Sequence, residues 1–344
     1  MITIKRIEIR TPFALDRVNC YYIKDSTPTL VDAGINTEES FNVVKAAIEE
    51  SGGAVEELKR IILTHAHSDH IGLVKRLVDM SGAAVYMHRW DLPKVCHRGT
   101  EDFSKWTEKF REFFLESGVP DETVEQTVAS MLERFKVFYS PFEGARPLEG
   151  GDKIVFDEFI LEAMHTPGHT PGSICLLDRL HGTLFSGDSL LEKITSNPMV
   201  ELDDSMVKSD YKAVERFLSS LALLDLAPVS KVLPGHGEPF LNHRKRIEEL
   251  YMHHQDRMKK VLQILKSDKT TSGIFNGKTG FQVANALFHT LDGLDLFLGL
   301  SEAHGHLELL EQKGIVFSSK RGIRRFYYPG NDRAKAALCS VSSK

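Results

Sequence analysis

The sequence has little of what several large classes of protein require. Its 344 residues include only four cysteines, and no two of them form a Cys-x-x-Cys pair. A thiolate metal site is therefore not expected, and neither is a disulfide framework. No run of about 18 uncharged apolar residues is present, and the N-terminus lacks the apolar segment of a signal peptide. We expect a cytoplasmic protein without a membrane span.

The chain also lacks a net positive charge, because its 48 acidic residues outnumber its 43 lysines and arginines and give a net charge of -5 at pH 7. Nucleic-acid binding needs a basic surface, so a dedicated nucleic-acid binder is disfavoured, although one local basic patch is compatible with this total. The chain is longer than one typical domain. This length favours a large domain, residues 1–240, followed by an appendage, residues 241–344.

Within the large domain, short apolar runs alternate with loops. Residues 2–9 and 19–33 are rich in Ile, Tyr, Thr and Val and predict strands, and a helix capped by Thr37 is expected next. Between residues 150 and 240, the runs KIVFDEFILEAMHT, SICLLD, GTLFSGD and KVLPGHG predict further strands. Several of these runs, and the earlier run RIILT, end in a loop that carries His or Asp. We therefore expect polar side chains to gather at one edge of a sandwich.

A helical insert is expected at about residues 90–145. Its first apolar stripe is aromatic and recurs at helical spacing; a second stripe follows Pro120. Two compatible interpretations are open: the stripe packs a helical pair onto the body of the protein, or part of it lines an apolar pocket. The aromatic residues are Phe103, Trp106, Phe110, Phe113 and Phe114.

The segment THAHSDH carries the densest set of chemically active side chains. His65 and His67 are two residues apart and project to one side of an extended loop, whereas Asp69 and His70 open the next helix. Imidazole and carboxylate are the usual ligands of zinc and of non-haem iron. The alternative, a polar loop with solvated histidines, is strongly disfavoured by this spacing.

Three further candidate ligands each follow an apolar strand and stand beside a glycine. They are His169 in HTPGHTPGS, Asp188 in LFSGDS and His236 in VLPGHGEP. Glycine lets the backbone approach a metal closely, and proline stiffens the loop. Each signal is weak alone, but together and in this order they predict a shared metal site.

With these residues the chain resembles the metallo-β-lactamase superfamily, on its glyoxalase II-like side. The His-x-His-x-Asp-His motif and the three later ligands have counterparts in that family, over residues 1 to about 240 outside the insert. The resemblance implies an α/β (α+β) fold, an αββα sandwich with the metals at one edge. It also implies that one metal is held by His65, His67 and His169, that the other is held by Asp69, His70 and His236, and that Asp188 bridges both.

The implied activity is hydrolysis by a bridging hydroxide between two divalent metal ions, with Zn²⁺ expected and Fe or Mn as alternatives. Two cations lower the pKa of a bridging water from about 15.7 toward 7. Asp69 and Asp188, the catalytic candidates, offset the metal charge. A thioester or related small acyl substrate is favoured, because a thiol with a pKa near 8.5 leaves without a general acid. The basic residues with which glyoxalase II binds glutathione are not recognisable, so the acyl carrier stays open.

The appendage is expected to contain a long helix, about 243–265, then two shorter helices and a hairpin. The second short helix is predicted to start at Ser301 and end at Gly314, and the hairpin to turn near Gly322. This order is winged-helix-like and is similar to the tail of the lactamase-like endoribonucleases. A packing, lid or homodimer role is favoured over nucleic-acid binding, despite the basic wing residues Lys320, Arg321, Arg324 and Arg325.

Three other functions fit parts of the pattern. A metal-dependent endoribonuclease acting on single-stranded RNA would use the wing arginines. A mononuclear-iron sulfur dioxygenase would leave His70 and His236 unexplained, and a regulator with a sensory domain would not need a complete metal site.

Histidines outside the ligand set have simpler interpretations. His165 is expected to order its loop through a hydrogen bond, with proton donation as the alternative. The paired histidines of the appendage are interpreted as packing or surface residues: His253, His254, His304 and His306.

Overall fold

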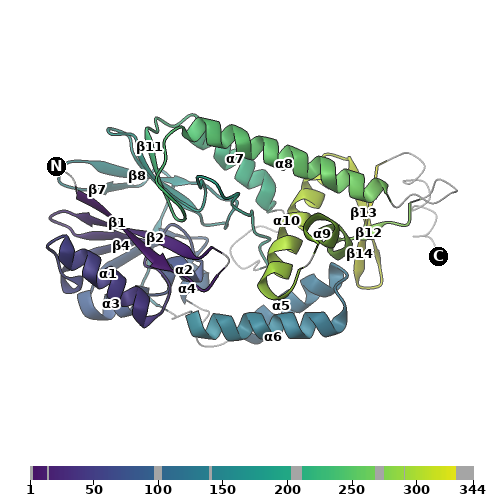
Figure 1. The fold of residues 1–344 in the computed structure, drawn as a ribbon, viewed down its shortest axis with the longest axis horizontal. Coiled ribbons are helices and arrows are strands. Elements are labelled where there is room, and N and C mark those ends of the chain that lie inside the picture. The colour runs from purple at the N-terminus through teal and green to yellow at the C-terminus, as the bar shows by residue number, and fades with distance from the viewer. Residues whose placement is uncertain are drawn as a thin grey trace.

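Two β-sheets face each other at one end of the molecule (Figure 1). The computed structural model describes residues 3–13, 15–96, 103–138, 142–202, 211–267, 275–289 and 291–330. The first sheet has the order β1-β2-β3-β4-β5-β6, and its strands are β1 (Thr3–Arg10), β2 (Arg17–Lys24), β3 (Thr29–Val31), β4 (Arg60–Ile62), β5 (Ala84–His88) and β6 (Arg146–Leu148). The second has the order β11-β10-β9-β8-β7, and its strands are β7 (Lys153–Val155), β8 (Ile160–His165), β9 (Ile174–Asp178), β10 (Thr183–Gly187) and β11 (Lys231–Pro234).

Residues 20–23 of strand β2 form an apolar run because both faces of the strand are covered. Tyr21 and Ile23 lie in the core between the two sheets, whereas Cys20 and Tyr22 lie in the core on the outer side of the first sheet. Successive side chains of a strand point to opposite faces, so a strand covered on both sides needs apolar residues at every position. Cys175 in β9 is buried in the same way, and both cysteines are the buried small residues that the sequence predicts.

Helices cover both outer faces of the sandwich. On the first sheet they are α1 (Glu38–Glu50), the 3₁₀ turn η1 (Val55–Glu57), α2 (Ser68–Ile71) and α3 (Val74–Ser81), and on the second they are α7 (Ala213–Asp225) and α8 (His243–Lys266). The Thr37 hydroxyl accepts a hydrogen bond from the Ser40 amide at 3.1 Å, and so caps α1 as expected. The αββα sandwich is confirmed.

The insert forms α4 (Leu92–Cys96), α5 (Phe103–Glu116) and α6 (Asp121–Phe138). Phe110 and Phe114 are buried, and both rings pack against Phe297 of the C-terminal unit. Trp106 packs against the same core. The aromatic stripe is a packing face, as the first interpretation expects, but its main partner is the pair of C-terminal helices rather than the sandwich. Phe113 also lines a cavity of about 420 Å³, whose other walls carry many charged residues.

The C-terminal unit contains β12 (Lys278–Thr279), α9 (Gly280–Phe288), α10 (Gly293–Gln312), β13 (Val316–Arg321) and β14 (Arg324–Pro329), with the sheet order β12-β14-β13. The expected order of two helices and a hairpin is confirmed. Gly314 and Gly322 both have positive φ, 67° and 60°, where the second helix ends and the hairpin turns.

The predicted start of the second helix at Ser301 was wrong. The helix begins at Gly293, because the residues before Ser301 carry an apolar face that packs into the shared core with the insert. Ser301 is fully buried, and its hydroxyl accepts a hydrogen bond from the Val200 amide instead.

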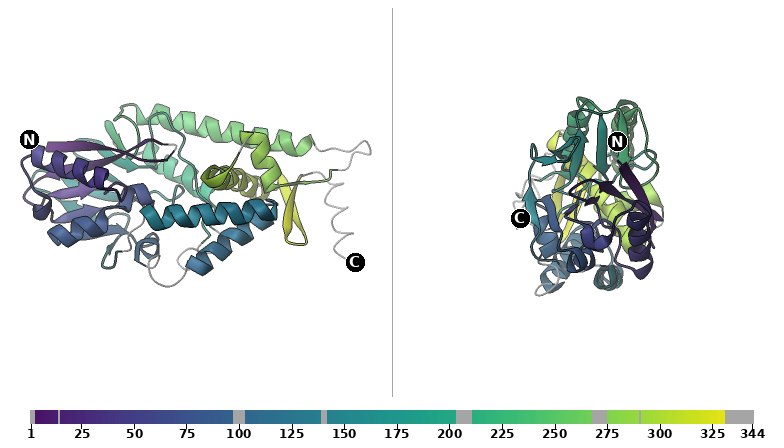
Figure 2. Two further views of the ribbon diagram at one scale, coloured as in Figure 1. Left: turned by 60° about the horizontal axis from the view of Figure 1, so that its bottom comes forward. Right: turned by 90° about the vertical axis from the view of Figure 1, so that its left-hand side faces the viewer.

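Helix α8 has 24 residues and runs along one side of the molecule from the sandwich to the C-terminal unit (Figures 1 and 2). It matches the long helix expected at about 243–265. Among the residues that the structure describes, no helix is both long and apolar enough to cross a membrane.

Candidate metal centre

All seven predicted ligands meet at one edge of the sandwich. Each lies just after a strand: His65, His67, Asp69 and His70 follow β4, whereas the others follow β8, β10 and β11 of the second sheet. Their ligand atoms form two adjoining groups, within each of which all atoms lie within 4.8 Å of one another. The groups are His65, His67, His169 and Asp188, and Asp69, His70 and His236.

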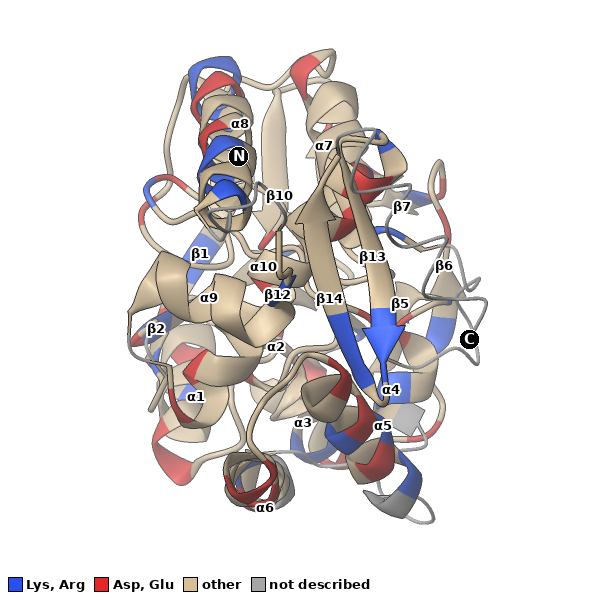
Figure 3. Cartoon of the chain, turned by 90° about the vertical axis from the view of Figure 1, so that its right-hand side faces the viewer, with Lys and Arg blue, Asp and Glu red and all other residues tan. Residues whose placement is uncertain are grey.

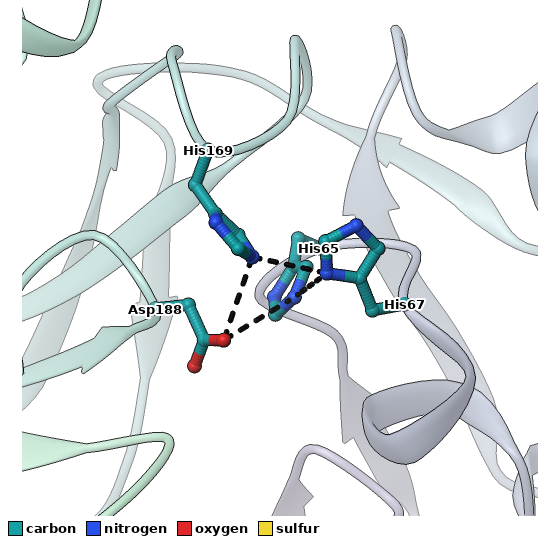
Figure 4. A group of neighbouring side chains, drawn as sticks. All are labelled: His65, His67, His169 and Asp188. Carbon is teal, nitrogen blue, oxygen red and sulfur yellow. Dashed lines mark hydrogen bonds and ion pairs between the residues drawn. The ribbon is translucent and has the colours of Figure 1, made fainter. Parts of the chain in front are cut away.

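The first group joins the two sheets (Figure 4). His67 Nδ1 lies 3.0 Å from His65 Nε2 and 3.0 Å from His169 Nε2. Asp188 Oδ2 lies 3.4 Å from His169 Nε2. Figure 4 shows the three rings and the carboxylate pointing toward one another. Three imidazole nitrogens and one carboxylate oxygen therefore face a common point.

The second group lies on the other side of Asp188. His70 Nε2 is 3.4 Å from His236 Nε2 and 3.5 Å from Asp188 Oδ1. His236 Nε2 is 3.4 Å from Asp188 Oδ2 and 3.5 Å from Asp69 Oδ2. Asp188 is thus in contact with histidines of both groups, in the bridging position that the resemblance implies.

Burial and neighbouring charges divide the histidines into two kinds. Burial lowers the pKa of His65 and His67 well below the usual range, and neighbouring histidines lower it further. Burial also lowers the pKa of His70, but the carboxylates of Asp188 and Asp32 outweigh it and raise the pKa to about 10. The first group is therefore set to present neutral imidazoles, which is the form that binds a metal ion.

Two glycines, Gly187 and Gly235, allow the loops that carry Asp188 and His236 to lie close to the other candidate ligands. A Cβ atom on Gly235 would lie 2.3 Å from Asp188 Oδ1 and 2.8 Å from His70 Cε1. Gly187 has a φ of 47°, and a Cβ there would lie 2.6 Å from the Thr64 hydroxyl. Both positions exclude a side chain, so the glycines beside Asp188 and His236 are part of the site's geometry.

Two buried aspartates outside the ligand set hold it in place, and the sequence reasoning missed both. Asp32 accepts hydrogen bonds from the Thr64 amide and hydroxyl at 2.8 and 2.9 Å, and its Oδ2 is 2.8 Å from His70 Nδ1. A carboxylate on the second nitrogen of a ligand histidine fixes the orientation of its ring. The signal was available, because Asp32 directly follows a strand and stands close to a glycine, as Asp188 does.

Asp91 ties the two main ligand loops together. Its Oδ2 accepts from the Ala66 amide at 3.0 Å and from the Thr170 hydroxyl at 2.7 Å, and its Oδ1 accepts from the Gly172 amide at 3.1 Å. The side chain is fully buried. The local sequence does not mark this residue as part of the site, because the loop residues that it joins are distant along the chain.

The remaining histidines follow their simpler interpretations. His165 Nε2 donates to the Pro171 carbonyl at 2.8 Å, which orders the loop, and its ring stacks on His88. His254 Nδ1 and His306 Nε2 lie 3.0 Å apart in the interface between α8 and α10. Cys96 and His97 had no assigned role; the Cys96 side chain and all of His97 lie outside the described residues.

The donor set fits two metal ions. Asp188 Oδ1 is buried and has no hydrogen-bond partner, which is costly unless a cation binds it. Among the described residues, neither Asp69 nor Asp188 pairs with a lysine or arginine. Histidine nitrogens and carboxylate oxygens suit zinc, and iron or manganese as well. These residues are able to bind divalent metal ions.

Comparisons with known proteins agree with this geometry. Residues 14–236 match the model of the metallo-beta-lactamase superfamily. The chain is 29% identical over 320 residues to the probable metallo-hydrolase YqjP of Bacillus subtilis (strain 168), covering 92% of this chain and 94% of that protein. It is 28% identical over 233 residues to the acyl-coenzyme A thioesterase MBLAC2 of Gallus gallus, covering 65% and 74%.

A solved structure extends the likeness to the whole described fold. The metallo-beta-lactamase family protein TTHA1429 from Thermus thermophilus aligns with a TM-score of 0.78 and 26% identity, over 95% of this chain and 98% of that one. The family model spans all seven candidate ligands, and the relative that matches over 92% of this chain is described as a probable metallo-hydrolase. The chain belongs to the metallo-β-lactamase superfamily and has its metallo-hydrolase architecture.

Proposed function

We propose that this protein hydrolyses thioesters or related acyl substrates with the aid of two divalent metal ions, of which zinc is expected first. The observation that carries the proposal is the position of Asp188. Its two oxygens lie 3.4 Å from His169, 3.4 Å from His236 and 3.5 Å from His70. One carboxylate thus faces both ligand groups, as a site for two adjacent metals requires.

The chain's own residues prepare the site for this chemistry. Two divalent cations held by these residues would lower the pKa of a bound water toward 7 and would supply positive charge to polarise a carbonyl group. Asp69 and Asp188 offset the cationic charge. Asp32 fixes the ring of His70, and Asp91 holds the loops that carry His67 and His169 at a constant separation. Burial of the ligands excludes bulk water and strengthens each of these electrostatic interactions.

An acyl thioester is the favoured substrate class for two reasons. A thiolate, with a pKa near 8.5, leaves without a proton donor, whereas an alkoxide needs one. The likeness to MBLAC2, described as an acyl-coenzyme A thioesterase, supports the same substrate class. Glyoxalase II-like action on thioesters is part of this proposal, with the acyl carrier left open.

RNA cleavage is the competing function, and the hairpin counts against it. Three basic residues of the hairpin, Lys320, Arg321 and Arg325, have hydrogen-bond partners within the protein. Lys320 Nζ and Arg325 Nε donate to Glu116 of the insert at 2.8 and 2.6 Å, and Arg321 donates to the Tyr328 hydroxyl at 2.6 Å. Figure 3 shows these basic tips of β13 and β14 beside α5. Charges already paired within the protein contribute less to phosphate binding.

The deciding experiment compares metal-loaded and chelator-treated protein on three substrates: an acyl-coenzyme A thioester, a lactone and a single-stranded RNA. We expect metal-dependent thioester hydrolysis to be the fastest by at least about tenfold, ~1.4 kcal/mol in barrier, and His67→Ala to remove it. Protein that binds no metal after reconstitution would refute the metal mechanism. Rapid RNA cleavage with slow thioester hydrolysis would replace the proposed substrate class.

A further inference from the structure

The loop after β10 holds the metal-ligand candidate His169 from outside the site. His169 Nδ1 lies 3.0 Å from the carbonyl oxygen of Asn197 and 3.0 Å from the hydroxyl of Ser196. The amide of Met199 donates to the His169 carbonyl at 3.3 Å. The ring and the backbone of His169 are therefore both fixed by residues 196–199. The opposite nitrogen, Nε2, is the one that faces His67 and Asp188.

The same loop is fastened to the middle of α10, in the C-terminal unit. The side-chain amide of Asn197 donates to the Leu298 carbonyl at 2.9 Å. The amide of Val200 donates to the Ser301 hydroxyl at 2.6 Å. Ser196 and Ser301 are buried, with 4% and 0% of their surface exposed. Hydrogen bonds this well shielded from water hold their groups firmly, because breaking one would leave buried polar atoms without partners.

Helix α10 is itself held on two other sides. Phe297 packs against Phe110 and Phe114 of the insert, with ring centroids 5.0 and 6.4 Å apart. On the other side, a Cβ atom on Gly305 would lie 2.6 Å from Val214 Cγ2, so α10 and α7 are in close contact. A helix packed against both the insert and α7 has little freedom to shift, and it can transmit its position to the loop.

We propose that Asn197 and Ser301 are positioning residues of the metal centre, through which α10 sets the orientation of the His169 ring. The C-terminal unit then tunes the metal affinity of one ligand group, that of His65, His67 and His169. The other group has its own supports, since Asp32 holds His70 and the Arg17 carbonyl faces His236 Nδ1. This inference rests on the metal centre of the proposed function, but not on the identity of the substrate.

The test measures metal affinity in two ligand-deleted backgrounds, by titrating metal-free protein with Zn²⁺ against a competing chelator. His236→Ala leaves the first group as the stronger site, and His67→Ala leaves the second. Asn197→Ala with Ser301→Ala is added to each. We expect zinc affinity to fall about tenfold in the His236→Ala background, as is usual when a support of a metal ligand is removed, and less than about twofold in the His67→Ala background. Ser219→Ala is the matched control, because its exposed hydroxyl bonds only within α7.

Three results separate the possibilities. Equal losses in both backgrounds, or no loss in either, would overturn the positioning role. If the double variant does not fold, judged by circular dichroism of the metal-free protein, Asn197→Ala alone tests the same link by deleting one of the two hydrogen bonds between the loop and α10, and it should give the same selective loss. If the wild-type protein binds no zinc, the metal centre itself is refuted. That result would contradict the proposed function and not only this inference.

Discussion

The metal edge and the interface of α7, α8 and α10 are built from the same residue types but are electrostatically different. The interface has four histidines and two largely buried glutamates; Glu302 lies 2.6 Å from Arg257, and Glu308 lies 2.6 Å from Lys212. At the metal edge, Asp69 and Asp188 face only histidines among the described residues. Buried acids with a lysine or arginine partner are already neutralised, whereas buried acids without one need a cation from solution.

The largest expected effect comes from removing the shared acid of the metal edge. Asp188→Ala deletes the carboxylate that faces both ligand groups, so we expect hydrolysis to fall at least about ten-thousandfold, ~5.4 kcal/mol in barrier. The bound metal, measured by elemental analysis, should fall to one ion per chain or fewer. The matched change in the interface, Glu302→Ala, should leave the metal content unchanged. If Asp188→Ala still bound two metal ions, the proposed difference between the regions, that only the acids of the metal edge need a cation from solution, would be contradicted.

A second prediction concerns stability in the interface. Glu302→Ala leaves the mostly buried Arg257 guanidinium without its partner, and we expect the free energy of unfolding to fall by about 3 kcal/mol. Denaturant titration of the metal-saturated protein measures it. Replacing both residues with leucine should recover most of the loss, because no buried charge is then left unpaired. A loss as large in the double variant as in the single one would show that the ion pair is not the cause.

The third prediction is a pH dependence of the free energy of unfolding that is caused by Glu308 in the interface. Burial raises the pKa of Glu308, but His304 and Lys212 outweigh it and lower the pKa to about 2. A carboxyl whose pKa is depressed on folding stabilises the protein above its unfolded pKa, near 4.5, and loses that contribution as pH falls toward 2. Metal-free wild type should exceed Glu308→Gln in stability at about pH 7, by on the order of 2 kcal/mol, and the difference should shrink by about pH 3. A difference that stays constant across this range would contradict the assignment.

The smallest expected effect concerns the hairpin. Changing Lys320, Arg321, Arg324 and Arg325 together to alanine should leave hydrolysis of a short acyl thioester within about threefold, ~0.65 kcal/mol in barrier. RNA binding by the wild type should be weak and should vanish at physiological salt. Strong RNA cleavage that is lost in this variant, with both metals retained, would place the function in the C-terminal unit.

The sequence predicted which seven side chains gather at the metal edge, because the signal of each is local. His65 and His236 each follow an apolar strand, and the ends of neighbouring strands meet at one edge. Asp91 could not be found this way, since three of its partners come from two distant loops. The support of His169 by Asn197 was hidden for another reason: the contact uses a backbone carbonyl, which any residue type has.

The insert shows a different limit. Helical spacing of the aromatic residues correctly indicated a buried face, but spacing does not tell which surface covers it. The partner proved to be Phe297, about 180 residues further along the chain. The start of α10 was misplaced for the same reason, because the residues before Ser301 are apolar on account of that distant contact.

The indirect link from α10 through residues 196–200 to His169 has a consequence for the order in which the protein is made. All seven ligands precede Ser301 in the chain, and His236, the last of them, is separated from it by 65 positions. At about 5–20 residues per second, a ribosome needs roughly 3–13 s to cover that interval. A nascent chain therefore exposes a full set of ligands before the helix that orients one of them has been synthesised. A metal ion that binds during that interval would bind a site in which the His169 ring is less firmly oriented than in the complete protein.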